Sequence, residues 1–127
     1  GMMLLGQSIF DTEGREHPMA GILPFKAKKG SLSIGYREAT SNNKSPITNL
    51  GDKLIGHEFH RWEVINKSYN SKINPLWNLK GWNIEIKNEG FCNNLIHASW
   101  IHLHWASSPN IIETWGRSVI NNAKQIS

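Results

Sequence analysis

Apolar and polar residues alternate along several short segments of the 127-residue chain, and this period-two pattern predicts strands. Residues 54–65 alternate best, so their odd- and even-numbered side chains are expected on opposite faces of a sheet. One face carries Phe59, Arg61 and Glu63, and the other carries His60, Trp62 and Val64. The two histidines of this segment, His57 and His60, are therefore expected to point in opposite directions.

Three further segments complete the predicted sheet. Residues 32–37 alternate in the same way. Residues 76–87 are typical of a strand pair or of one long hairpin arm, with a turn or bulge at Gly81, and Glu89-Gly90 is expected to end the segment. Residues 94–105 form the last predicted strand region.

Helical spacing of apolar residues appears near both ends of the chain. Met2, Met3, Leu5 and Ile9 can share one face of a short helix over residues 2–10. Ser107-Ser108-Pro109 is a typical helix start, with a serine at the N-cap and a proline at the first helical position. The apolar face of the helix that follows, which is expected to end near Lys124, consists of Ile111, Ile112, Trp115, Val119 and Ile120.

The order helix, strands, helix predicts one α/β domain over residues 1–127. Because turns join most of the strands, we expect a mixed, largely antiparallel sheet flanked by helices. The formal net charge of +4 comes with only one basic cluster, Lys26, Lys28 and Lys29, which argues against nucleic-acid binding. Cys92 is the single cysteine, so no intramolecular disulfide can form and a cytoplasmic location is expected. No apolar run approaches the roughly 20 residues of a membrane span.

Two segments concentrate histidine: GHEFHRWEV, residues 56–64, and HASWIHLHW, residues 97–105. His102 and His104 are two residues apart, so on a strand they face the same side and could bind a metal with His60 or Glu58 as third ligand. The same histidines could instead be hydrogen-bonded structural residues, or one of them could act as an acid–base group near a thiol. The spacing alone leaves these alternatives open.

Five stretches, in this order and at these separations, resemble the C-terminal class I glutamine amidotransferase domain of cobyrinic acid a,c-diamide synthases. They are GMMLLGQSI (1–9), HPMAGILPF (17–25), LSIGYREA (32–39), GHEFHRWEV (56–64) and ASWIHLHWASSP (98–109). The resemblance implies a class I amidotransferase-like fold and a role in cobalamin biosynthesis. The family enzyme, a ligase, uses ATP and magnesium to activate the a and c carboxylates of a corrin precursor. Its amidotransferase domain hydrolyses glutamine and supplies the ammonia.

The resemblance also implies residue roles. His102 matches the histidine that activates the family's nucleophilic cysteine and carries a proton to the leaving ammonia. Glu58 and His60, within GHEFH, are candidate supporting residues, although Glu58 could equally be a strand glutamate paired with Arg61 or Arg37. On this interpretation the chain holds no metal and no cofactor of its own; ATP and magnesium belong to the full-length enzyme.

The sequence departs from the family in one respect, because the nucleophilic cysteine of the family lies just before the stretch that begins here at Gly1. Cys92 has no nucleophile-elbow pattern and is expected to be a structural thiol. The 127 residues are therefore interpreted as a partial domain that is inactive alone. Three explanations stay open: a split-gene product whose partner, an upstream half, carries the cysteine; a truncated gene or isolated domain; or a stand-alone descendant with a binding or structural role. A homodimer or a partner chain is expected to cover the exposed apolar surface. The alternatives are a non-catalytic binding or assembly module and, in third place, a metal-binding domain.

Overall fold

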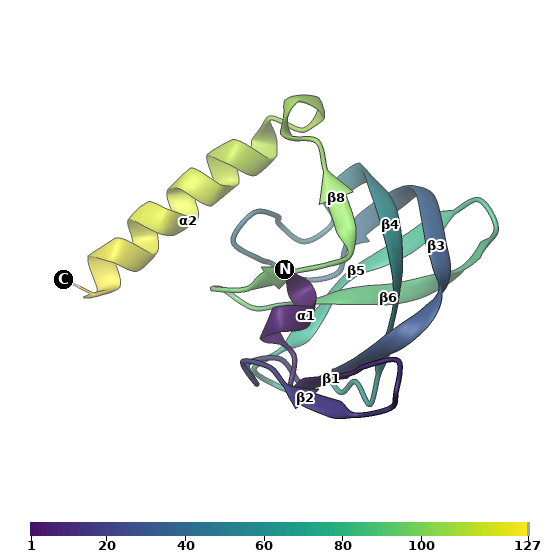
Figure 1. Ribbon diagram of the computed structural model, residues 1–127. Helices are drawn as coiled ribbons and strands as arrows, with labels where there is room; N and C mark the ends of the chain where they lie inside the picture. Colours follow the sequence, from purple (N-terminus) through teal and green to yellow (C-terminus); the bar gives the residue numbers. More distant parts are fainter. Residues whose placement is uncertain (127) are drawn as a thin grey trace.

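The structure is a computed structural model that describes residues 1–126 (Figure 1). The strands are β1 (Ser8–Phe10), β2 (Glu16–Pro18), β3 (Lys26–Ser41), β4 (Lys53–Ile65), β5 (Asn74–Gly81), β6 (Ile84–Cys92), β7 (His97–Ala98) and β8 (Ile101–Leu103). The helices are α1 (Met2–Leu5), the 3-10 turn η1 (Trp105–Ser107) and α2 (Asn110–Ile126). The predicted order of helix, strands and helix is confirmed.

The long strand β3 organises the sheet. It pairs with β1 at its start, with β4 along most of its length, and with β5 at its end. The strand order is β2-β1-β3-β5-β6-β7, with β4 lying between β3 and β8 off this path. Of the strand pairs within residues 1–126, only β1–β3 is parallel. The predicted α/β class with a mixed, largely antiparallel sheet is therefore confirmed.

The N-terminal helix is shorter than its apolar spacing predicts. It ends at Leu5, and residues 8–10 form β1 instead of a second helical turn. The reason is tertiary: a Cβ at Gly6 would lie 2.9 Å from the ring of Phe25, and the Gln7 amide donates to the Phe25 carbonyl at 2.8 Å. The residues just after α1 therefore pack against, and hydrogen-bond to, the segment that leads into β3, and do not continue the helix.

Two predicted strand boundaries are also wrong. Glu89-Gly90 does not end the hairpin, because Gly90 takes a positive φ of 77° and β6 continues to Cys92. A Cβ at Gly90 would lie 2.8 Å from the Ala98 carbonyl oxygen, so only glycine lets β7 approach here. The predicted strand region 94–105 contains only β7 and β8, separated by a bend at Ser99 and Trp100.

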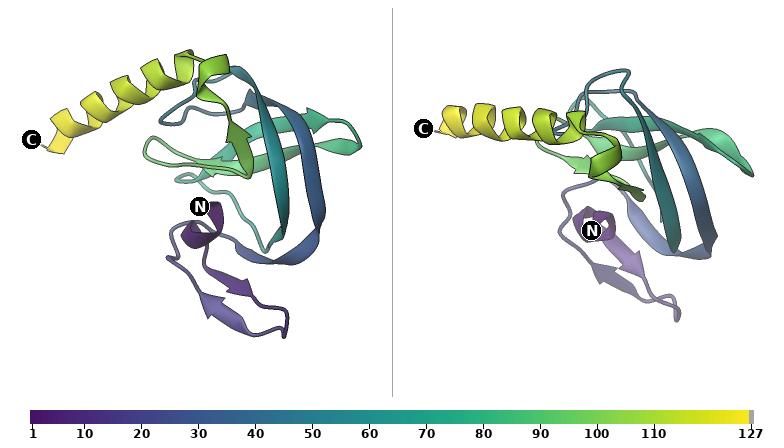
Figure 2. Two further views of the ribbon diagram at one scale, coloured as in Figure 1. Left: turned by 45° about the horizontal axis from the view of Figure 1, so that its top comes forward. Right: turned by 90° about the horizontal axis from the view of Figure 1, so that it is seen from above.

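Helix α2 extends away from the sheet and covers neither of its faces, as the three views agree (Figures 1 and 2). Ile111 is its buried residue, and Trp115 packs edge-on against Trp105 with ring centroids 5.7 Å apart. The rest of its apolar side, including Val119 and Ile120, is about half exposed. The sequence predicted the helix and its apolar face, and the structure shows that face open.

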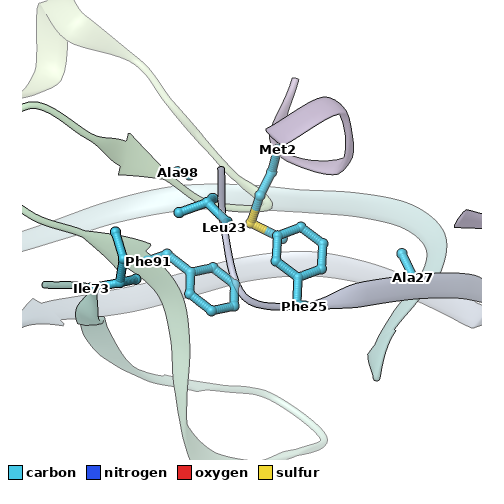
Figure 3. Packing of buried hydrophobic residues seen from close by; sticks show 7 residues of the cluster. All are labelled: Met2, Leu23, Phe25, Ala27, Ile73, Phe91 and Ala98. Carbon is cyan, nitrogen blue, oxygen red and sulfur yellow. The ribbon is translucent and has the colours of Figure 1, made fainter. Parts of the chain in front are cut away.

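The core beneath the N-terminal segment joins α1 to the sheet (Figure 3). Phe25 stacks on Phe91 with ring centroids 4.9 Å apart, and around them gather Met2, Leu23, Ala27, Ile73 and Ala98. A second cluster lies under β5 and β8 and consists of Ala39, Leu76, Trp77, Leu79, Cys92 and Ile101. Burial raises the pKa of the Cys92 thiol to about 11, which supports a structural thiol.

His97 packs beside this second cluster. Its Nδ1 lies 2.9 Å from the Ser45 hydroxyl, and its ring packs edge-on against Trp77 at 4.9 Å. Burial lowers the pKa of His97 from 6.5 to about 4, so the ring is neutral at pH 7.

The low pKa of His97 predicts an acid-dependent loss of stability. The unfolded chain binds a proton at His97 below about pH 6.5, whereas the folded chain resists it until about pH 4. We expect the free energy of unfolding to fall by about 2 kcal/mol between pH 6.5 and 5, where most carboxylates stay ionised. Urea unfolding at both pH values measures this loss. His97→Gln should remove most of it, and a variant with an unchanged pH dependence would contradict the assignment.

Candidate active site

A buried ion pair joins the two longest strands. Arg37 of β3 and Glu58 of β4 are 3% and 1% exposed, and Arg37 Nε donates to Glu58 Oε2 at 2.7 Å. Arg37 also donates to the carbonyls of Tyr36 and Ile34 at 3.1 and 3.3 Å. Of the two partners that the sequence suggested for Glu58, the structure selects Arg37; Arg61 lies on the exposed face of β4.

His60 completes this network from the same side of β4. Its Nε2 lies 2.8 Å from Glu58 Oε1, and its Nδ1 accepts the Trp62 amide at 3.2 Å, so the hydrogen-bond pattern assigns the proton to Nε2. Its ring stacks on Trp100 at 4.3 Å. Burial alone would raise the pKa of Glu58, but the hydrogen bonds from His60 and Arg37 outweigh it and hold that pKa at about 2. Glu58 is therefore a firmly ionised carboxylate.

His102 lies on the other side of the sheet. In the β4–β8 pair His57 faces His102, and Glu58 faces Ile101. Because neighbouring residues of a strand point to opposite faces, the Glu58–His60 pair and His102 are separated by the sheet. The structure thus confirms that His57 and His60 point in opposite directions, and within residues 1–126 no hydrogen bond joins Glu58 to His102.

His102 is exposed on a short strand that is held at two points. Gly56 allows β8 to approach β4, because a Cβ there would collide with the Ile101 side chain and lie 2.9 Å from the His102 carbonyl oxygen. On the other flank, Glu89 accepts hydrogen bonds from the Ser99 hydroxyl at 2.6 Å and the Trp100 amide at 2.9 Å.

Glu89 supports the site, and its role is not visible in the sequence. It also accepts the Trp77 indole N–H at 2.8 Å, and burial raises its pKa above the usual range. All three donors are at least ten residues away along the chain, so no local pattern could have revealed it. Its effect is to fix the bend from which β8, and with it His102, emerges.

His104 follows β8 and precedes η1, and its carbonyl accepts hydrogen bonds from the amide and hydroxyl of Ser107. The predicted pair of histidines on one strand therefore does not form, since only His102 lies within β8. Among residues 1–126 no group of three histidine, cysteine or acidic side chains could hold a metal ion. A pocket of about 430 Å³ opens on the other side of β4, where Met2 of α1 meets Glu58, His60 and Trp100.

Comparison with known proteins assigns this arrangement to a family. The model of the CobB/CobQ-like glutamine amidotransferase domain matches residues 1–110. The chain belongs to this family. The match includes β4, β8 and both histidine segments, so the resemblance seen in the sequence is confirmed at the level of the family. In the part of the chain that the structure describes, no helix is long and apolar enough to cross a membrane.

The relatives of this amidotransferase chain carry specific names. The cobyrinate a,c-diamide synthase of Synechococcus sp. is 37% identical over 118 residues, covering 91% of this chain and 25% of that protein. The enzyme of the same name from Gloeobacter violaceus is 38% identical over 108 residues, covering 84% and 22%. The hydrogenobyrinate a,c-diamide synthase of Streptomyces coelicolor is 35% identical over 95 residues, covering 74% and 18%. The chain thus spans between 18% and 25% of the length of these relatives.

The buried position of Glu58 predicts a large stability cost for its removal. Glu58→Ala leaves Arg37 charged and unpaired in the interior, so we expect the free energy of unfolding at pH 7 to fall by about 3–5 kcal/mol in urea titrations. The matched control is Glu63→Ala on the same strand, where Glu63 Oε2 lies 3.6 Å from Lys28 Nζ and both side chains are at least half exposed. That change should cost less than about 1 kcal/mol. Equal losses in the two variants would contradict the structural role of Glu58.

Proposed function

We propose that this chain supplies the histidine side of the glutaminase centre of an a,c-diamide synthase. His102 is the proposed acid–base group, and its position carries the proposal: an exposed imidazole on a strand fixed by Gly56 and Glu89, inside the region that matches the amidotransferase family. The relatives named for a,c-diamide synthesis support corrin carboxylates as the acceptors of the ammonia.

The chemistry proposed for His102 is a two-way proton transfer. The imidazole takes the proton from a cysteine thiol, and the thiolate attacks the side-chain carbonyl carbon of glutamine. As the carbon–nitrogen bond breaks, the imidazolium returns its proton to the departing amine, giving ammonia and a thioester. Water, deprotonated by the same imidazole, then cleaves the thioester to glutamate and restores the thiol.

The nucleophile is not Cys92. Its thiol is buried, donates to the Pro75 carbonyl at 3.7 Å, and has a pKa of about 11, so the thiolate is scarce at pH 7. The proposed nucleophile is a cysteine from outside these 127 residues, and the chain by itself is proposed to be inactive towards glutamine. ATP, magnesium and the activation of the corrin carboxylates are likewise assigned to other parts of the enzyme, in the cytoplasm.

A second candidate is a non-catalytic binding or assembly module that keeps the fold. The observation that favours it is the outer face of β3 and β4, where large apolar side chains are 53–74% exposed: Ile34, Tyr36, Ile55 and Phe59. A homodimer or a partner chain would cover this surface. Under the first proposal the same surface lies beside His102 and belongs to the glutaminase centre.

Glutaminase activity tests the first proposal. In the Synechococcus cobyrinate a,c-diamide synthase, the quarter that matches is replaced by this chain, and glutamate release is measured for the chimera and for this chain alone. We expect activity only in the chimera, and His102→Ala should lower kcat by at least about 100-fold, the usual contribution of a general acid–base group.

The control variant is His104→Ala, in the same motif but outside β8, which should leave kcat within about threefold. A folded chimera without glutaminase activity would favour the binding module. An active chimera in which His102→Ala changes nothing would refute the catalytic role of His102.

A further inference from the structure

The outer face of the sheet carries a row of three side chains across three adjacent strands. Tyr36 of β3 faces His57 of β4, and His57 faces His102 of β8. In antiparallel pairs, facing Cβ atoms lie about 4.5–5.5 Å apart, so His57 is the immediate lateral neighbour of His102. Both strand pairings are antiparallel and uninterrupted at this row.

The position of His57 within the row is fixed. Its ring packs edge-on against Tyr36, with ring centroids 5.3 Å apart and planes inclined by 75°. Gly56, the residue before it, permits the close approach of β8 that brings His102 alongside. His57 is partly buried between its neighbours, whereas Tyr36 and His102 are exposed.

A histidine that deprotonates a nucleophile needs a partner that fixes its tautomer and orientation. Glu58 cannot fill this role for His102, because it lies on the opposite face and its oxygens are engaged by Arg37 and His60. On the face of His102, β4 contributes His57 and β3 contributes Tyr36. One row further lie Glu38, which is paired with Lys80 at 3.0 Å, and His104 after the end of β8.

We propose that His57 is the positioning residue of His102, accepting a hydrogen bond from one ring nitrogen of His102 so that the other nitrogen is left free to take the thiol proton. The inference rests on the proposed glutaminase function of His102. It divides the GHEFH segment between the two faces of β4: Glu58 and His60 stabilise the fold, and His57 serves the chemistry. Tyr36 acts on His57 in turn, by holding its ring edge-on.

Ring nitrogen NMR of the isolated chain tests the pairing without any activity. With uniformly ¹⁵N-labelled protein, we expect His102 to show one dominant tautomer, and His57→Phe should return it towards the mixture seen for a free imidazole. His57→Gln keeps an acceptor on the strand and should restore much of the preference. The matched control, Phe59→Leu, changes an apolar side chain of the same face in the next row and should leave the His102 signals unchanged.

Kinetics of the chimera described above add the functional readout. His57→Phe should lower kcat by about 10-fold or more and leave KM within about threefold, with partial rescue in His57→Gln. If His102 has the same tautomer in the native chain and in the His57→Phe and His57→Gln variants, the positioning role is overturned, whatever the activity of the chimera. If the tautomer of His102 depends on His57 but the native chimera releases no glutamate, the pairing of the two histidines stands and the proposed function fails.

Discussion

The ion pair between Arg37 and Glu58 is the constraint on which the arrangement of β3 and β4 depends. Both side chains are almost fully buried, so each charge has lost its water and must be compensated inside the protein. Hydrogen bonds provide this compensation: Glu58 accepts from Arg37 and His60, and Arg37 also donates to two carbonyls of its own strand. Such a pair adds little net stability compared with an apolar core. Its consequence is specificity, since any other register of β3 against β4 would leave two buried charges unpaired.

Fixing this register has an effect on the opposite face. Strand side chains alternate, so placing Glu58 inward forces His57 and Phe59 outward, and pairing with β8 then puts His102 next to His57. On the inward face the buried polar side chains are hydrogen-bonded, and His60 stacks on Trp100. The outward face is open, with exposed aromatic and aliphatic side chains around two imidazoles. A buried, hydrogen-bonded face and an open face are therefore both encoded in the same nine residues by strand periodicity.

The parts of the fold that the sequence could reveal are those set by local periodicity. The alternation in residues 54–65 correctly separates His60, Trp62 and Val64 from Phe59, Arg61 and Glu63. The irregularity predicted at Gly81 is also present, because the register of β5 against β6 shifts between Leu79 and Gly81, and the hairpin turns directly afterwards at Trp82 and Asn83. The parts that could not be predicted depend on distant contacts. Gly6 ends α1 because Phe25 occupies the space beside it, and Gly90 continues β6 because β7 needs the room. Glu89 meets its donors only after β5, β6 and the bend at residue 99 have come together.

The candidate site shows the same division. The family resemblance pointed to His102, and periodicity alone showed that His57 and His60 diverge, but it could not say which histidine of GHEFH shares a face with His102. The answer depends on the register of β8 against β4. A shift of β8 by one residue would have placed His102 opposite Glu58, a strong hydrogen-bond acceptor. The close approach of β8 at Gly56 selects His57 instead.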